Sequence, residues 1–329
     1  RQQGLAAGAP PMAIYASNET HSSIDKAAIG LGLGADSIRR VAVDDALRMD
    51  PAALEEAIAA DRAAGRLPIA VVATLGTTSP TSADIAAICR REGLWRHVDA
   101  AWAGSAAVCP EERAAFAGWE SADSIVFNPH KWLFTPMDCS ILFVRDPDRL
   151  RAAFSLVPEY LVTPDVRGAV HPAKIDLMDF GVQLGRRFRA LKLWFVMRAF
   201  GVEGLRERLR EHLRLGRELA ERIDADPHFE CLAPTPFSVV CFRALPPGAA
   251  TDPEAIDQLN ETLLGEILTD GSVFLSHTRV HGRYALRIAV SNLRTAARHV
   301  DAAWELTRTA AARLRAEFPL RGGERGETP

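Results

Sequence analysis

The side chains best suited to covalent chemistry stand in the sequence Asn128-Pro129-His130-Lys131-Trp132. Lys131 supplies a primary amine just after the apolar run of residues 124–127. Earlier in the chain, Asp99 supplies a carboxylate directly after another apolar run, residues 95–98. Such an amine can form a Schiff base, and such an anion can pair with a cationic ring nitrogen. The pair predicts a lysine bound to pyridoxal phosphate and an aspartate that pairs with the ring nitrogen of that cofactor.

Lysine is scarce in this chain, which narrows the search for a covalent residue. Arginine is abundant, but it stays protonated and cannot serve as a Schiff-base amine. Lys26 and Lys192 fall in amphipathic helical patterns, where a solvated lysine is ordinary, and Lys174 falls in an irregular stretch. Lys131 alone follows a buried strand. The alternative interpretation of Lys131 is an ordinary turn lysine.

Asp99 favours the chemical interpretation of Lys131. A carboxylate at the C-terminal end of a buried strand lies where α/β enzymes place their ligand-binding groups. The alternative is a helix cap or turn former for residues 100–104. A buried anion would keep a pyridinium nitrogen protonated, and the ring could then accept electrons from the substrate Cα. Loss of Asp99 should therefore cost catalysis more than folding.

The elements that must position these groups alternate through the first half of the chain. The expected strands are residues 12–16, 38–43, 69–74, 95–98, 124–127 and 140–144. The expected helices are residues 22–33, 51–64 and 83–91. Apolar strands separated by helices predict an α/β fold with a mixed, mostly parallel sheet flanked by helices. Residues 154–174 are rich in proline and lack periodicity, which predicts a long loop that acts as a lid.

The second half of the chain has a different order of elements. Helices are expected at residues 184–200 and 202–225, separated by Gly201. Further strands are expected at residues 230–232, 238–242, 272–276 and 284–290, with helices at 253–268 and 295–315. This order predicts a small α+β domain with an antiparallel sheet. We expect a large cofactor-binding domain at residues 1–200, a small domain at 201–320 and a tail at 321–329.

Length and composition limit the class of protein. The chain has 329 residues, a formal net charge of -3 and a mean hydropathy of -0.02, enough for one large and one small domain. The balanced charge argues against nucleic acid or a membrane surface as the main partner. No apolar run reaches the ~20 residues that span a bilayer, and no signal peptide stands at the start. Because the first residue is Arg1, we expect a fragment that lacks its N-terminal part.

The five cysteines are scattered, odd in number and without a CxxC pair. They are Cys89, Cys109, Cys139, Cys231 and Cys241. This pattern predicts no disulfide framework and no metal site. Buried thiols in a reducing cytoplasm are the better interpretation.

Five ordered motifs resemble those of the group II pyridoxal-phosphate-dependent decarboxylases, the family that includes the aromatic-L-amino-acid decarboxylases. The resemblance extends from Tyr15 to about Leu314. The matching segments are His21-Ser22-Ser23, residues 72–78, His97-Val98-Asp99-Ala100-Ala101, residues 128–132 and residues 184–189. The resemblance implies the type I, aspartate-aminotransferase-like fold and a homodimer with its sites at the interface. It also implies that a serine-rich turn for the cofactor phosphate lies in the absent N-terminal part.

The resemblance further implies a role for each matching residue. Lys131 would form the Schiff base, Asp99 would pair with the pyridinium nitrogen, and Ala101 would pack against the ring. His21 would stack on the opposite ring face, where the alternative is a polar residue at a helix start. Thr74 would hydrogen-bond near the cofactor, where the alternative is a threonine at a strand end without a ligand.

Three more residues follow from the resemblance. Asn128 and His130 would help to hold the phosphate and orient the lysine, where the alternative is ordinary turn formation. Tyr160 matches a tyrosine that closes over the site and assists protonation of the carbanion after carbon dioxide leaves. A surface tyrosine is the alternative there. Family members with phenylalanine at this place form aldehydes by oxidative deamination, so Tyr160 favours simple decarboxylation to an amine.

The residues after Lys131 bear on the choice of substrate. Trp132 after the lysine is similar to aromatic and histidine decarboxylases, whereas Met137 and Gln183 differ from better-known relatives. We expect decarboxylation of an L-amino acid, and Trp132 favours an aromatic one. The alternatives are a histidine or acidic amino-acid decarboxylase, an aldehyde synthase, and a non-catalytic relative of the same fold.

Overall fold

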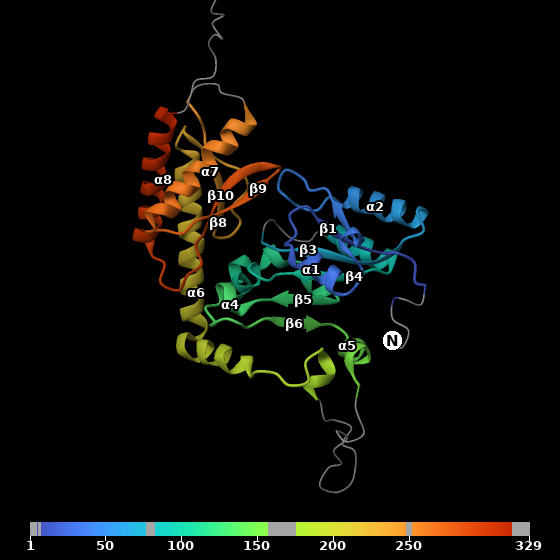
Figure 1. Ribbon diagram of the computed structural model, residues 1–329. Helices are drawn as coiled ribbons and strands as arrows, with labels where there is room; N and C mark the ends of the chain where they lie inside the picture. The colour runs from blue at the N-terminus through green and yellow to red at the C-terminus, as the bar shows by residue number, and fades with distance from the viewer. Residues whose placement is uncertain (1–4, 6–7, 77–82, 157–175, 248–251, 318–329) are drawn as a thin grey trace, which may run out of the picture. The chain divides into compact units, whose positions relative to one another are not determined.

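A computed structural model of the chain describes residue 5 and residues 8–76, 83–156, 176–247 and 252–317. The chain separates into two units, and each is described by itself (Figure 1). Unit 1 comprises Arg1–Leu75, Pro80–Ser105 and Ala114–Ala199. Unit 2 comprises Gly76–Ser79, Ala106–Arg113 and Phe200–Pro329.

Unit 1 is built on a six-stranded sheet in the order β2-β1-β3-β4-β5-β6. Its strands are β1 (Met12–Ser17), β2 (Ile38–Val41), β3 (Leu67–Thr74), β4 (Trp95–Asp99), β5 (Ser124–Phe127) and β6 (Ile141–Val144). Neighbouring strands run parallel except for β6, which pairs antiparallel with β5. The carboxyl ends of β1, β3, β4 and β5 therefore meet at one edge of the sheet. The predicted mixed, mostly parallel sheet is confirmed.

Helices cover both faces of this sheet. On one face, α2 (Pro51–Ala63) and α3 (Ala83–Glu92) pack Leu54 and Ile88 against Tyr15 and Val71. On the other face, α1 (Ser23–Gly30) packs Ala28 against Val72, the next residue of β3. Because successive side chains of a strand point to opposite faces, the face of any strand residue follows from its register.

Short helical segments connect β4 to β6. After β4 come the 3-10 segments Ala103–Val108, Pro110–Phe116 and Trp119–Ser121. The single helical turn α4 (Pro129–Trp132) follows β5, and α5 (Pro147–Phe154) follows β6. Sequence periodicity does not reveal elements this short. The predicted lid at 154–174 lies mostly outside the described residues, so it stays a prediction.

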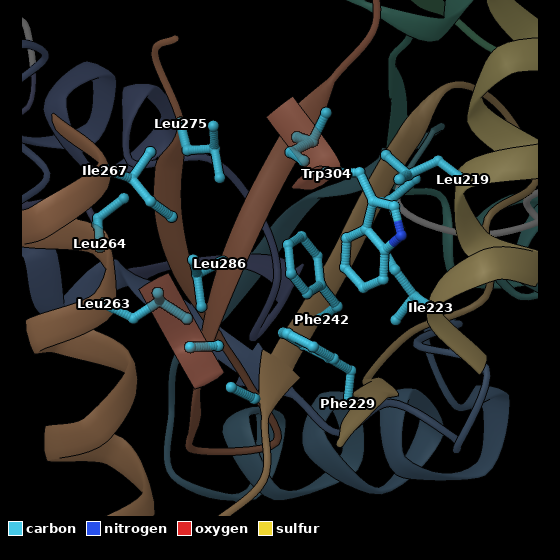
Figure 2. Packing of buried hydrophobic residues seen from close by; sticks show 14 of the residues in the cluster. Leu219, Ile223, Phe229, Phe242, Leu263, Leu264, Ile267, Leu275, Leu286 and Trp304 are labelled. Carbon is cyan, nitrogen blue, oxygen red and sulfur yellow. The ribbon is translucent and has the colours of Figure 1, made fainter. Parts of the chain in front are cut away.

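Unit 2 holds a four-stranded antiparallel sheet in the order β7-β8-β10-β9. Its elements are β7 (Phe229–Cys231), β8 (Val239–Ala244), α7 (Pro253–Asp270), β9 (Ser276–Val280), β10 (Arg283–Ala289) and α8 (Ala297–Glu317). Helices and sheet share one apolar core (Figure 2). Phe229, Phe242 and Trp304 form a triangle of rings, in which the Phe229 centroid lies 4.8 Å from that of Trp304 and 6.3 Å from that of Phe242. The predicted small α+β fold of this region is confirmed.

The long helix α6 (Arg189–Asp224) bends at Gly201. Gly201 has φ 63° and ψ 178°, a conformation essentially restricted to glycine. The break was predicted at this residue. The start was not, because residues 184–188 are irregular and the first stretch of the helix begins only at Arg189.

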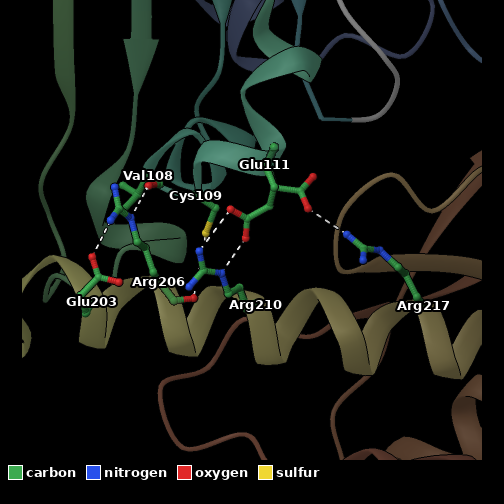
Figure 3. A network of polar contacts seen from close by, with 8 residues as sticks. Val108, Cys109, Glu111, Glu203, Arg206, Arg210 and Arg217 are labelled. Atoms are coloured by element: carbon green, nitrogen blue, oxygen red, sulfur yellow. Dashed lines mark hydrogen bonds and ion pairs between the residues drawn. The ribbon is translucent and has the colours of Figure 1, made fainter.

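Polar contacts fix the segment after β4 that belongs to unit 2 (Figure 3). Arg210 on α6 donates to both carboxylate oxygens of Glu111, at 2.6 and 3.2 Å. Arg217 donates to Glu112 at 2.8 Å, and Arg206 Nε donates to the carbonyl oxygen of Val108 at 2.9 Å. Residues 106–113 are thereby held along the same helix within unit 2.

One predicted strand was wrong. Residues 272–276 were expected to be extended, but β9 begins at Ser276 and continues to Val280. Gly271 ends α7 in the left-handed conformation, and the Asp270 carboxylate accepts from the backbone N–H of Ser272 at 3.2 Å. This turn chemistry overrides the apolar sequence that follows, in which Phe274 is 85% exposed.

Candidate active site

The candidate site lies at the carboxyl ends of β3, β4 and β5. Thr74 pairs in register with Asp99, which in turn pairs with Val126. Val72 and Thr74 are two residues apart on β3, so they share a face, and Val72 packs on the side of α1. Thr74 and Asp99 therefore point to the face that α1 covers. This is the edge where open α/β sheets bind ligands.

Asp99 is a buried carboxylate with few partners. It is 8% exposed, and its Oδ1 accepts the backbone N–H of Ala101 at 3.0 Å. Within the residues that the structure describes, no arginine, lysine or histidine forms an ion pair with it. A carboxylate removed from water is costly unless a cation or several hydrogen bonds compensate it. The geometry therefore fits a cationic ligand group at Asp99, such as a protonated ring nitrogen.

Lys131 lies in the turn that follows the neighbouring strand. Its backbone N–H donates to the carbonyl oxygen of Asn128 at 2.9 Å, and its side chain is exposed. The backbone N–H of Asn128 donates to the carbonyl oxygen of Ala101 at 3.0 Å. The turn that carries the amine is thus bonded to the residue that holds the carboxylate of Asp99.

Asn128 and His130 flank this turn in different ways. Asn128 Oδ1 is buried and has no hydrogen-bond partner in the part of the chain that the structure describes. A buried polar atom without a partner requires an explanation, and a bound polar ligand is one. His130 is already engaged, because its Nδ1 lies 2.6 Å from the carbonyl oxygen and 3.1 Å from the backbone nitrogen of Cys139. These contacts join the turn to the backbone of Cys139.

Thr74 belongs to a chain of hydroxyl groups. Its Oγ1 lies 3.4 Å from Thr20 Oγ1, which lies 3.2 Å from Ser17 Oγ. Ser17 and Thr20 are buried at the end of β1, and sequence reasoning missed both. The available signal was two hydroxyl residues three positions apart at the carboxyl end of a buried strand.

His21 occupies the loop between β1 and α1. Its side chain is exposed, and its Nδ1 accepts the backbone N–H of Ser23 at 3.1 Å and lies 2.9 Å from Ser23 Oγ. The structure therefore brings Thr74, Asp99, Ala101 and Asn128 together at the sheet edge, with Lys131 in the adjoining turn. His21 is on the same side of the sheet, where it also caps the start of α1.

His97 lies beneath Asp99 on the same face of β4. Its Nδ1 lies 2.8 Å from Ser124 Oγ, which also accepts the indole N–H of Trp95 at 2.8 Å. Burial lowers the pKa of His97, and the attraction of Asp99 opposes that shift. A neutral imidazole beneath Asp99 leaves the carboxylate charge available to a ligand.

Tyr160, the predicted proton donor, lies outside the described residues. Within the described ranges, no cluster of three or more histidine, cysteine or acidic residues could hold a metal ion, and no helix is long and apolar enough to cross a membrane.

An α/β fold that places an amine and a buried carboxylate at neighbouring strand ends is that of the type I pyridoxal-phosphate enzymes. The model for the pyridoxal-dependent decarboxylase conserved domain matches residues 9–245, and the chain belongs to that family. The family predicted from the five motifs is thus confirmed.

Curated relatives and solved structures agree with this assignment. A tryptophan decarboxylase of Camptotheca acuminata is 41% identical over 304 residues, which are 91% of this chain and 60% of that relative. A phenylacetaldehyde synthase of Arabidopsis thaliana is 37% identical over 92% of this chain and 62% of that relative. The structure of Oryza sativa TDC with PLP and tryptamine matches with a TM-score of 0.87 and 38% identity, covering 94% of this chain and 64% of that one. The chain therefore spans about 60% of the first of these relatives.

Proposed function

We propose that the protein decarboxylates an L-amino acid, most simply an aromatic one, to the corresponding amine and carbon dioxide with pyridoxal phosphate as cofactor. The observation that carries this proposal is the buried carboxylate of Asp99, which lacks a cation among the described residues and lies one strand from the turn of Lys131. Family membership and the relatives' activities support it.

The residues present fit this cofactor. Lys131 would hold it covalently and Asp99 would pair with its ring nitrogen, while Thr74 and Ala101 would contact its ring. Asn128 Oδ1 would gain the partner that it lacks among the described residues, and His130 would fix the turn. His21 would cover the opposite face. When bound, pyridoxal phosphate supplies an electron sink for the bond that breaks at the substrate Cα.

The protein's own groups would perform four tasks. The uncharged amine of Lys131 would act as the nucleophile. The negative charge of Asp99, held by the N–H of Ala101, would keep the ring nitrogen protonated. His21 would approach the substrate carboxylate. The hydroxyl of Tyr160 would deliver a proton to Cα after carbon dioxide departs, which completes the amine.

An amine-release assay across tryptophan, tyrosine, dopa, histidine and glutamate tests the proposal. We expect stoichiometric amine and carbon dioxide with an aromatic substrate, and no hydrogen peroxide. Activity confined to histidine or glutamate would move the substrate to the alternatives, and the absence of product from every amino acid would contradict the proposal.

An aldehyde synthase is the second candidate, and the phenylacetaldehyde synthase relative favours it. Tyr160 separates the two, because a hydroxyl group that protonates Cα directs the reaction to the amine. We expect Tyr160→Phe to retain the cofactor but to form less amine. Turnover should be diverted to aldehyde, ammonia, carbon dioxide and hydrogen peroxide, with dissolved dioxygen as the oxidant and one water molecule consumed. Unchanged amine production by this variant, measured with an oxidase-coupled peroxide assay in parallel, would show that Tyr160 has no such role.

We also propose a homodimer. On the part of α6 that belongs to unit 1, Trp194, Phe195 and Met197 are 52%, 57% and 51% exposed, so an apolar surface remains to be covered. Light scattering should give twice the mass of one chain, and Phe195→Glu should reduce that value. A monomeric parent protein would contradict the proposal.

The location that we propose is the cytoplasm. Cys89, Cys109 and Cys139 are free thiols buried in the fold. Unpaired thiols are typical of a reducing compartment. Fractionation of the source cells would test this location, and recovery outside the cytoplasmic fraction would contradict it.

A further inference from the structure

The helical turn that carries Lys131 is too short to hold its own orientation. The turn α4 has four residues, and its N-cap residue Asn128 makes no side-chain capping hydrogen bond. A single turn fixes several backbone dihedral angles for very few hydrogen bonds, so it is unstable by itself. Tertiary contacts must therefore set the direction in which the side chain of Lys131 leaves the turn.

Trp132 is the apolar anchor of that turn. Its side chain is completely buried and is the largest of the fully buried side chains. Its ring stacks on Trp102, with a centroid separation of 4.2 Å and an interplanar angle of 2°. Successive side chains of a helix are ~100° apart, so burial of Trp132 directs the neighbouring Lys131 outward.

Trp102 lies in the turn that follows Asp99. It directly follows Ala101, whose N–H donates to the Asp99 carboxylate and whose carbonyl oxygen accepts from Asn128. The aromatic stack and the Ala101 peptide therefore form two links between the same two turns. One turn carries the carboxylate, and the other carries the amine.

Packing at this junction leaves little room for adjustment. A Cβ at Gly104, two residues beyond Trp102, would lie 2.9 Å from Phe127 Cδ2 and 3.3 Å from the Cβ of Ala100. Phe127 is the last residue of β5. The turn after β4 is thus pressed against the strand that leads to Lys131, so that a shift of the Trp102 ring would be transmitted to α4.

We infer that Trp102 is a positioning residue, which through its stack on Trp132 fixes the amine of Lys131 relative to the carboxylate of Asp99. This inference rests on the proposed function. Trp102 acts through Trp132, so its loss should disturb the geometry of the amine rather than remove a reacting group. Trp132 is buried, so it would not contact the substrate. It would influence the choice of substrate only through the orientation of the turn that carries Lys131.

The experiment compares Trp102→Ala and Trp102→Phe with the parent protein in two assays. The first is hydrogen exchange of the peptide that contains residues 128–135 in cofactor-free protein. The second is the rate of covalent capture after mixing with pyridoxal phosphate. In this step Lys131 Nζ forms a C=N double bond to the aldehyde carbon, the C=O bond breaks, and the oxygen leaves as water with the two amine hydrogens. We expect faster exchange in Trp102→Ala and capture slowed about tenfold or more, because small misplacements of reacting groups cost one to two orders of magnitude. Trp102→Phe keeps an aromatic ring and should recover most of the rate.

Trp119→Ala provides the control. Trp119 also belongs to unit 1 and packs on Phe116 at 4.9 Å, away from the two turns. It should lower the thermal unfolding midpoint as much as Trp102→Ala does but leave the capture rate unchanged. A capture rate in Trp102→Ala within twofold of the parent would overturn the inference, whether or not exchange accelerates. If the parent itself captures no cofactor, the proposed function fails and this role of Trp102 fails with it.

Discussion

Asp99 carries a buried negative charge, and no cationic side chain among the described residues pairs with it. Asp61 is a useful contrast, since it is equally a buried aspartate but is fully compensated. Its carboxylate accepts from the hydroxyl of Tyr15 at 3.0 Å and from Arg39 Nε at 3.1 Å, and Arg66 lies 3.7 Å away. Asp61 is therefore compensated within the fold, whereas the buried charge of Asp99 is the feature on which we base the proposed cofactor site.

This contrast predicts opposite outcomes for two isosteric substitutions. Asp99→Asn keeps an acceptor for the N–H of Ala101 and removes an uncompensated buried charge, so the cofactor-free protein should be at least as stable as the parent. Its decarboxylation rate should fall by about 10²–10³, the usual effect of losing one electrostatic stabiliser. Asp61→Asn should instead lower the free energy of unfolding by about 1–3 kcal/mol.

Urea unfolding of cofactor-free protein and the amine-release assay measure the two effects. A strongly destabilised Asp99→Asn variant would mean that Asp99 is structural. Full activity in that variant would remove Asp99 from the site altogether.

At the residue scale, the sequence predicted those features that depend on neighbours along the chain. Lys131 and Asp99 each follow an apolar run, so their places at strand ends were predictable. The contact between His130 and the Cys139 backbone was not, because it depends on how the chain returns after the turn. The stack of Trp102 on Trp132 was not predictable either. It joins two turns that come close together only because β4 and β5 are neighbours in the sheet.

At the element scale, the junction of β4 and β5 depends on close packing at one glycine. Gly104→Ala would place a Cβ against the Phe127 ring and the Ala100 Cβ. We expect a loss of about 1–3 kcal/mol in the free energy of unfolding, the usual cost of overpacking. Gly265 is the matched control, since it lies within α7 with nothing within 4 Å of an added Cβ.

Gly265→Ala should stabilise the protein by roughly 0.5–1 kcal/mol through helix propensity. Chemical denaturation of both variants measures the difference between them. Equal stability of Gly104→Ala and the parent would show that the turn after Asp99 is loosely packed. That result would also count against a positioning role for Trp102.

Elements were predicted where periodicity persists over many residues. The strands of the large sheet, α7 and α8 were predicted from apolar patterns. In the structure Asp252 caps the start of α7 and Gly271 ends it. The single turn α4 and the 3-10 segments after β4 are too short to show a period. The strand expected at 272–276 was wrong because turn chemistry around Asp270 outweighs an apolar run.

At the scale of the whole molecule, His97 in unit 1 is partly buried and His212 in unit 2 is fully buried, and the cost of burying these two imidazoles depends on pH. Burial lowers the pKa of His97 and of His212 below the ordinary value of 6.5. The Asp99 carboxylate opposes the shift at His97, and a hydrogen bond with the Asn292 backbone, followed by the charge of Glu211, opposes the shift at His212. The unfolded chain therefore takes up these protons first as the pH falls. Stability should be fully present above about pH 6.5 and should decline as the pH falls through the lowered pKa values.

His97→Gln and His212→Gln test this dependence separately. Each variant should show a flatter decline of the free energy of unfolding between neutral and mildly acidic pH than the parent does. An unchanged slope in both variants would assign the acid sensitivity to other groups.

The order of elements predicted the architecture of both units, and the motifs predicted the family. The features that the sequence did not predict depend on contacts between residues that are distant in sequence. Ser17 and Thr20 join Thr74 only through the pairing of β1 with β3, and Glu111 meets Arg210 only in the folded unit.

The most direct test of the account is to identify which lysine binds the cofactor. The protein is incubated with pyridoxal phosphate, reduced with borohydride, digested and mapped by mass spectrometry, with Lys131→Ala in parallel. We predict one reduced pyridoxyl group on Lys131 of the parent and none at that position in the variant, with the associated visible absorbance lost. Label on Lys26, Lys174 or Lys192 instead, or no label at all, would contradict the assignment of the site.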